Sequence, residues 1–325
     1  MNTINKGRWI SVGLVFLLGL SACATSHTST PIVAAMQYLP EQGEHLINRH
    51  APVFLIEEYL TAHNRIGAVR AGSEGSIWID PDTPILYTEQ RQFFTAKAKY
   101  TNLIYRIHFS KVPAGFSPFY LTAGKNVGLI VVITLSPDGL PLLYTMVHTC
   151  GCYLAFIPTS NLPAHAYPNN WKAGHQTVFG ETLPTALNYA ALLPDKQQVQ
   201  IRIRPDTHRI MDVWLASEET RAKSVITASL QPLSNLKHLQ TGTGQRISFY
   251  EDSGARAGYV KGSFKSRERW LMSWWTMDWR IGQDKYLGAH KHDGPVFYTS
   301  LKPWARNASD MRDFAGFLKY WGWGL

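Results

Sequence analysis

The sequence has few charged residues, few cysteines and no long apolar run. Charged side chains make up 17% of its 325 residues, whereas hydrophobic residues make up 45% and aromatic residues 12%. This composition excludes intrinsic disorder for most of the chain, because disordered chains have too little apolar surface to offset the entropy lost on folding. No apolar run reaches the roughly 18–20 residues of a spanning helix, which excludes a multi-span membrane protein.

The first 23 residues carry a distinctive order of charge and hydrophobicity. Basic Lys6 and Arg8 precede an apolar stretch over residues 9–20, and the sequence Leu-Ser-Ala-Cys then ends at Cys23. The apolar stretch is too short to cross a bilayer. The order of these parts resembles a bacterial lipoprotein signal, in which small residues precede the cysteine that receives lipid before the peptidase cuts.

The lipoprotein resemblance implies how the chain is divided. Residues 1–22 would be removed as a signal peptide, Cys23 would carry the lipid (palmitate), and residues 23–35 would form a flexible tether of small and polar residues. In Gram-negative lipoproteins a residue other than Asp after the cysteine, here Ala24, implies transport to the outer membrane. We expect residues 36–325 to form a single globular β-rich domain held in the cell envelope.

Basic residues outnumber acidic ones. Removing residues 1–22 takes away two basic residues and no acidic one, so the net charge falls from +9 to +7. A cationic protein in the envelope would be attracted to anionic lipid or to an anionic wall polymer. The basic residues are spread along the chain, and nucleic acid is not expected as a partner outside the cytoplasm.

The body of the chain consists of short strand patterns separated by turn sequences. Two apolar runs at 127–135 and 140–148 flank the sequence Ser-Pro-Asp-Gly at 136–139, which predicts an antiparallel hairpin that is apolar on both faces and therefore central. Alternating residues at 199–204 and 210–215 predict a second hairpin. The pattern favours a mainly β (α+β) fold, an antiparallel β-sandwich-like domain with C-terminal aromatic helices.

The segment 101–109 shows the clearest alternation. Apolar side chains such as Leu103 and Ile107 occupy one set of positions, and polar side chains such as Arg106 and His108 mostly occupy the other. This period of two is typical of a half-buried strand.

Two aromatic helical patterns occur late in the chain. Ser266 is the expected N-cap of the first, and the second covers 314–321. In the first, apolar residues recur at three- and four-residue spacing, namely Trp270, Leu271, Trp274, Trp275 and Trp279. Such stripes usually pack on a core. The alternative is an interfacial helix that contacts membrane or anionic groups through Arg267, Arg269, Trp270 and Trp274.

If lipid occupies Cys23, two cysteines remain, and both lie in the sequence His148-Thr149-Cys150-Gly151-Cys152. In a continuous strand His148, Cys150 and Cys152 project from one face, and the two cysteines lie about 6.6 Å apart, at the upper edge of the disulfide range. A turn at Gly151 would shorten that separation and permit a Cys150–Cys152 disulfide. An oxidising compartment favours some disulfide over two free thiols.

The same three side chains could instead hold a soft metal ion such as Zn or Cu. Further ligands would then come from His290 and His292, with His165 and His175 as weaker candidates. A third interpretation is a reactive thiol, with Cys150 as nucleophile, His148 accepting its proton, and Asp293 or another acid orienting the imidazole.

Three further segments resemble β-sandwich proteins of the necrosis-inducing and vacuolar-sorting-associated kind. They are Ala51-Pro52-Val53, the hairpin VITLSPDGLPLLYTMVH at 132–148 and the segment GPVFYTSLKPW at 294–304. Those families carry a His-x-x-Asp-Trp-Glu stretch before the hairpin, whereas this chain has Asn-Val-Gly-Leu-Ile-Val at 126–131. Their metal-binding acids are therefore absent, and the resemblance implies a sandwich fold without an activity.

Two functions fit these patterns. The first is an outer-membrane-anchored lipoprotein of the cell envelope that acts as a non-enzymatic binding or structural module, with the cysteines as a stabilising element. The alternative is a metal- or thiol-dependent envelope protein that uses the cluster of His148, Cys150 and Cys152.

Overall fold

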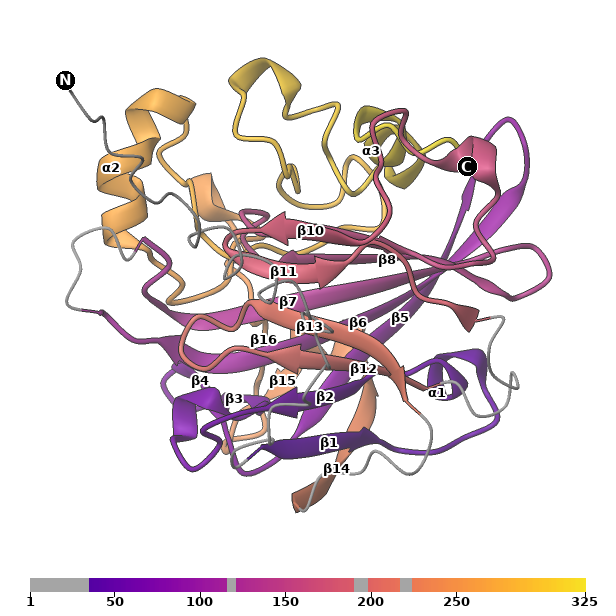
Figure 1. Ribbon diagram of the computed structural model, residues 1–325. Coiled ribbons are helices and arrows are strands. Elements are labelled where there is room, and N and C mark those ends of the chain that lie inside the picture. The colour runs from indigo at the N-terminus through magenta and orange to yellow at the C-terminus, as the bar shows by residue number, and fades with distance from the viewer. Residues whose placement is uncertain (1–34, 116–120, 190–197, 217–223) are drawn as a thin grey trace, which may run out of the picture. The chain divides into compact units, whose positions relative to one another are not determined.

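The structure of the protein is a computed structural model that describes residues 35–115, 121–189, 198–216 and 224–325 (Figure 1). The predicted signal peptide, Cys23 and nearly all of the predicted tether lie outside the described residues. The described residues form a mainly β protein, which confirms the expected fold class. Among these residues, no helix has the length and hydrophobicity required to span a membrane.

Ten strands form one large mixed sheet. Their order in space is β13 (Ile210–Ala216), β12 (Gln198–Ile203), β2 (Val53–Ile56), β1 (Met36–Pro40), β14 (Ser224–Pro232), β5 (Ile85–Phe94), β6 (Lys99–Val112), β7 (Gly124–Leu135), β8 (Pro141–His148) and β9 (Leu154–Pro158). Most neighbours are antiparallel, but β14 runs parallel to both β1 and β5, and β12 runs parallel to β2.

The described chain also contains three small two-stranded sheets, three short α-helices and several 3-10 helices of three to five residues. The paired strands are β3 (Ala68–Ala71) with β4 (Ile77–Asp80), β10 (His175–Val178) with β11 (Glu181–Pro184), and β15 (Leu239–Gln240) with β16 (Arg246–Ile247). The helices are α1 (Leu46–Arg49), α2 (Ser266–Thr276) and α3 (Phe314–Tyr320). Figure 1 shows the large sheet curling so that β12 and β13 lie over its central strands, with α2 at the periphery.

The central strands are buried on both faces, as the sequence predicted for the hairpin of β7 and β8. On β7, Leu129 and Val131 belong to a core cluster that also contains Ile201 of β12, so the two ends of the curled sheet face each other across this core. The intervening Ile130 and Val132 belong to a second cluster on the opposite face. The predicted hairpin of β12 and β13 is also present.

Helix α3 covers the second cluster. Phe317 is fully buried and its ring lies 5.7 Å from that of Phe156 on β9, while Phe314 and Leu318 are also buried. The core-packing interpretation is therefore correct for the C-terminal helix. It is wrong for α2, whose tryptophans are exposed, and α2 begins with Ser266 as its first residue rather than its N-cap, which is Lys265.

Strand β6 is not half-buried as its alternation predicted. Arg106 and His108 are completely buried, because additional segments of the chain cover the face that was expected to contact solvent. The Arg106 side chain donates from Nε to His108 Nε2 at 2.9 Å and from NH1 to the Lys285 carbonyl at 2.9 Å. The buried guanidinium of Arg106 thus depends on a carbonyl almost 180 positions later in the chain. A local sequence pattern cannot reveal such a distant partner.

Candidate functional site

The sulfur–imidazole cluster, His148, Cys150 and Cys152, lies where β8 ends. The strand stops at His148 and the chain then turns, so the continuous strand considered from the sequence does not form. The Gly151 amide donates to the His148 carbonyl at 2.7 Å, which closes the turn. The turn brings the Cα atoms of Cys150 and Cys152 to 5.5 Å, and in this structure their sulfurs are bonded.

Gly151 makes this turn possible for two reasons. Its φ of 85° lies in the left-handed region, which side chains disfavour. In addition, a Cβ atom placed on Gly151 would lie 2.2 Å from the carbonyl oxygen of Tyr298. The turn is therefore packed against a later segment of backbone, and only glycine leaves enough space.

His148 is held in a defined tautomer beside the sulfurs. Its Nε2 lies 3.0 Å from the His208 carbonyl oxygen, and because a carbonyl only accepts, Nε2 carries the proton and Nδ1 the lone pair. Burial lowers the pKa of His148 to about 4, so the ring is neutral near pH 7. A ring nitrogen and the two sulfurs all lie within 4.8 Å of one another.

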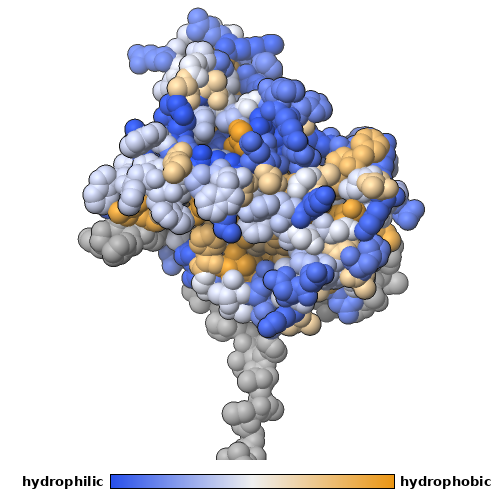
Figure 2. All heavy atoms as spheres, turned by 90° about the horizontal axis from the view of Figure 1, so that it is seen from above, coloured by the Kyte–Doolittle hydropathy of each residue, from blue (hydrophilic) through white to orange (hydrophobic). Residues whose placement is uncertain are grey.

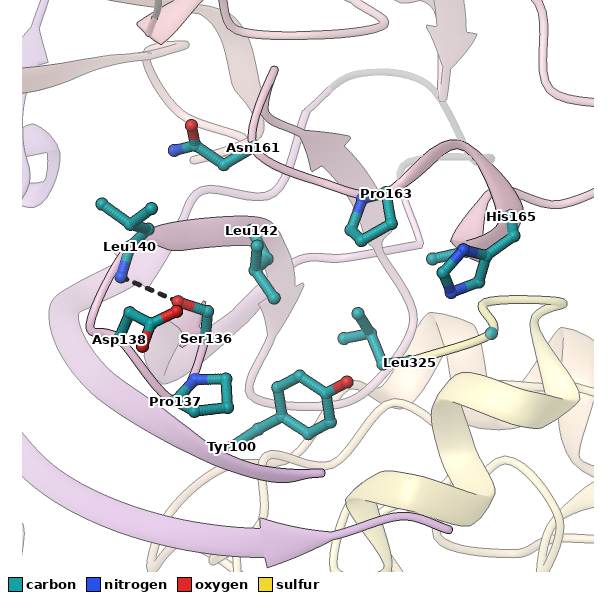
Figure 3. Close-up of a pocket in the computed structure, with 12 residues that line it drawn as sticks. Tyr100, Ser136, Pro137, Asp138, Leu140, Leu142, Asn161, Pro163, His165 and Leu325 are labelled. Atoms are coloured by element: carbon teal, nitrogen blue, oxygen red, sulfur yellow. Dashed lines mark hydrogen bonds between the residues drawn. The ribbon is translucent and has the colours of Figure 1, made fainter. Parts of the chain in front are cut away.

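The other histidines considered as ligands do not join this group. His290 and His292 are exposed residues of a turn, and His175 is an exposed residue of β10. His165 lines a pocket of about 250 Å³ elsewhere, between the β7–β8 turn and the C-terminal Leu325 (Figure 3). Among the described residues, the structure therefore brings together only the three members of the sulfur–imidazole cluster as a soft-metal group.

A buried carboxylate lies next to this cluster. Asp284 is fully buried and accepts hydrogen bonds from Thr149 Oγ1 and from Ser263 Oγ, the latter at 2.6 Å. The ammonium of Lys265 lies 3.6 Å from the same carboxylate and is only 3% exposed. Asp284 thus joins the turn that holds the cysteines to the residue that precedes α2.

Two more ionisable side chains extend this buried charge cluster. Burial lowers the pKa of Lys285 to about 8, and its Nζ lies 3.7 Å from the centre of the Tyr298 ring. Burial raises the pKa of Glu268, a residue of α2, above its ordinary value. The positive charge of Lys265 acts in the opposite direction and lowers that pKa. The Lys285 amide donates to the Thr149 carbonyl at 2.9 Å, so the cluster is tied to the cysteine turn by backbone as well.

The charge cluster has no room for a substrate. The cavity that reaches His148, Lys265 and Asp284 measures only about 10 Å³, close to the minimum for one water molecule. Its groups contact the cysteine turn and the start of α2. Sequence reasoning missed Asp284 and Lys285 because charged residues are rarely buried, and nothing in the surrounding residues marks them.

Helix α2 is amphipathic with its polar face inward. Its buried residues are Glu268, Ser273 and Thr276, which face the charge cluster and the protein interior. Its three tryptophans face outward, with Trp270 79% and Trp274 75% exposed, while Leu271 and Met272 are half-buried. A helix on a soluble domain ordinarily buries its apolar stripe, so this arrangement leaves an aromatic surface without a partner among the described residues.

This tryptophan surface comprises the exposed apolar residues on and beside α2. They are Phe264, Trp270, Trp274, Trp275, Met277 and Trp279. Phe264 and three of the tryptophans line a hollow of about 390 Å³ that also contains Arg269, whose guanidinium lies 5.4 Å from the Phe264 ring. Arg267, also predicted for this surface, donates to the Gly115 carbonyl at 3.1 Å. Elsewhere on the upper side, strongly hydrophobic residues form separate areas between hydrophilic ones (Figure 2).

A neighbouring segment adds another exposed tryptophan. Arg306 donates to the carbonyls of Thr276 and Met277, which places its segment against the end of α2. Trp304, two residues earlier, is 83% exposed. Trp304 lies in the short 3-10 helix Pro303–Ala305, and its exposure was not predicted because a single tryptophan has no period to mark it.

Substituting Gly151 tests the packing of the cysteine turn. We expect Gly151→Ala to lower the free energy of unfolding by at least about 2 kcal/mol more than Gly139→Ala. Gly139 has a similar φ of 82°, but an added Cβ there meets nothing within 4 Å. Gly139→Ala therefore measures the cost of placing a side chain at positive φ without any steric contact. Urea denaturation of both variants measures the difference. Equal losses would show that the contact with Tyr298 is not a constraint.

Acid should destabilise the protein through its buried histidines. Burial lowers the pKa of His148 to about 4 and holds those of His108 and His208 well below the usual value. Between pH 6.5 and 4 the unfolded chain therefore binds more protons than the folded one, and stability falls as the pH falls, by roughly 3 kcal/mol for His148 alone. Urea midpoints at pH 7.5, 6 and 4.5 measure this. His208→Gln should reduce the change of the urea midpoint with pH, whereas His165→Gln, at an exposed position, should leave it unchanged. A wild-type midpoint that does not change with pH would contradict the prediction.

The sulfur–imidazole cluster and the tryptophan surface are thus the two features with distinctive chemistry in the described chain. One offers a disulfide beside a neutral imidazole, and the other offers exposed indole rings beside guanidinium groups. Comparison of the chain with models of protein families, with curated proteins and with solved structures finds no match.

Proposed function

We propose that this protein is a lipoprotein of the cell envelope, anchored to the outer membrane through Cys23, and that its domain is a non-enzymatic module that binds an anionic lipid surface. The observation that carries the proposal is the outward apolar face of α2, with Trp270 and Trp274 more than 70% exposed. The lipoprotein signal described above supplies the anchor.

Indole rings suit the boundary between lipid and water. Tryptophan is enriched at the head-group level of membranes, because its ring is largely apolar while its N–H can remain hydrogen-bonded to water or head groups. Arg269 lies in the hollow between these rings, where its charge can meet a lipid phosphate while the rings contact acyl chains. Each basic residue near an anionic surface contributes about 1 kcal/mol to binding.

The proposed anchor also brings the domain close enough to bind. Eleven residues lie between Cys23 and Ala35, and the twelve Cα–Cα steps between them reach at most about 40 Å when fully extended. The domain would therefore stay near the bilayer at a high effective concentration. A weak intrinsic affinity of the tryptophan surface is then sufficient to orient the domain on the membrane.

The lipid-binding surface is tested with protein that lacks residues 1–22 and carries Cys23→Ser, which cannot be acylated. We expect it to co-sediment with vesicles of phosphatidylglycerol and phosphatidylethanolamine at low salt, and to release as salt rises, because salt screens the arginine–phosphate attraction. The double variant Trp270→Ala/Trp274→Ala should lose at least about tenfold in partition coefficient.

Trp78→Ala is the matched control, since this exposed tryptophan lies on β4 rather than on α2. It should bind vesicles like the parent protein. No co-sedimentation at low salt, or equal losses in the α2 variant and the control, would contradict the proposed surface.

The anchor is tested separately in a Gram-negative host. We expect the full chain to fractionate with outer membranes, and Cys23→Ser to remain as an unprocessed precursor because the peptidase acts after the cysteine has received lipid. Mass spectrometry of the mature amino terminus should show an acylated cysteine at position 23. An unmodified amino terminus at another residue would refute the anchor.

A further inference from the structure

We propose that reduction of the Cys150–Cys152 disulfide converts the sulfur–imidazole cluster into a binding site for monovalent copper, with His148 and the two cysteines as its three ligands. The inference is independent of lipid binding, because it rests on the end of β8 and not on α2. In the bonded state the sulfurs carry no thiolate, so the site exists only in the reduced protein.

The three donor atoms are already close together. A ring nitrogen of His148 and both sulfurs lie within 4.8 Å of one another, and the Cα atoms of the two cysteines are 5.5 Å apart. Metal–ligand bonds of about 2.0–2.3 Å can be made from such positions by small side-chain rotations. The turn at Gly151, packed on the Tyr298 carbonyl, holds the two cysteines at this spacing.

The imidazole is oriented as a ligand by a group behind it. His148 Nε2 donates to the His208 carbonyl at 3.0 Å, which leaves the lone pair on Nδ1. A hydrogen bond from the distal nitrogen to a carbonyl is the arrangement that fixes tautomer and ring orientation in metal-binding histidines. The carbonyl comes from a different hairpin, so this orientation persists when the sulfurs separate.

The number and nature of the ligands favour monovalent copper over zinc. Structural zinc sites are almost always tetrahedral with four protein ligands, whereas the described chain brings only three donors together. Thiolates are soft ligands that select Cu(I), and the reducing conditions that free them also keep copper monovalent. Two thiolates and Cu(I) carry a net charge of −1, which the buried ammonium of Lys285 can compensate. Its Nζ lies 3.9 Å from the position that a Cβ on Gly151 would occupy.

The opening step is ordinary thiol–disulfide exchange with a dithiol reductant. A thiolate of the reductant attacks Cys152, which is the less buried of the two residues, and Cys150 leaves as a thiolate. The second thiol of the reductant then attacks the mixed disulfide, which releases Cys152 and leaves the reductant as a disulfide. Two electrons enter the protein, and copper replaces the protons on the two thiols.

The experiment uses the full chain with Cys23→Ser, in which Cys150 and Cys152 are the only cysteines. This protein is titrated with Cu(I) without oxygen, in competition with a chromophoric Cu(I) chelator, before and after reduction with a dithiol. We expect one equivalent to bind the reduced protein, with ultraviolet thiolate–copper absorption, and no binding to the oxidised protein. Cys152→Ser and His148→Gln should each weaken the affinity at least about tenfold. The double variant His290→Gln/His292→Gln is the control and should bind like the parent protein.

Several outcomes would overturn the inference. These are equal binding by oxidised and reduced protein, undiminished binding by Cys152→Ser, or stronger binding of Zn than of Cu(I) in a parallel competition titration. Circular dichroism of each reduced variant checks that it is folded. If His148→Gln unfolds, Cys152→Ser decides alone, because Cys152 is partly exposed and its hydroxyl analogue fits the same space.

Discussion

The buried carboxylate of Asp284 is the interaction on which both functional features depend. It binds the hydroxyl of Thr149, next to the first cysteine, and it pairs with Lys265, the residue from which α2 begins. Removing one partner of a buried charge pair typically costs about 3–5 kcal/mol, because the other charge is left without compensation. The cysteine turn and the tryptophan helix are thereby fixed to the same point of the core, although more than 110 residues separate them in the chain.

Helix α2 is oriented with its polar side inward, toward the buried charge cluster. Glu268 is buried on α2, where burial disfavours its charged form and the charges of Lys265 and Lys285 favour it. A helix that buries a glutamate on one side presents the opposite side to its surroundings. Here that side carries tryptophans. The tryptophans of α2 are therefore exposed in the described structure, on the side of the helix opposite its buried polar residues.

The proposed copper site and the proposed lipid surface differ in what controls them. The lipid surface consists of side chains that are always exposed, so its occupancy depends on the membrane and on ionic strength. The copper site is closed by a covalent bond and depends on the redox state of its surroundings. The shared charge cluster connects the two sites physically, since Thr149 and Lys265 both contact Asp284.

The sequence alone determined the mainly β class, the hairpins of β7–β8 and β12–β13, and the closeness of the sulfurs to His148, because these depend on residues within a few positions of one another. Only the tertiary structure decided three further points: the side of α2 that faces inward, the end of β8 at His148, and the burial of Arg106. Each of these depends on a distant partner: Lys285 for Arg106, Tyr298 for the turn, and Asp284 for the start of α2. Local periodicity shows that a segment has two unlike faces, but the side that is buried follows from the charges that the rest of the fold brings to it.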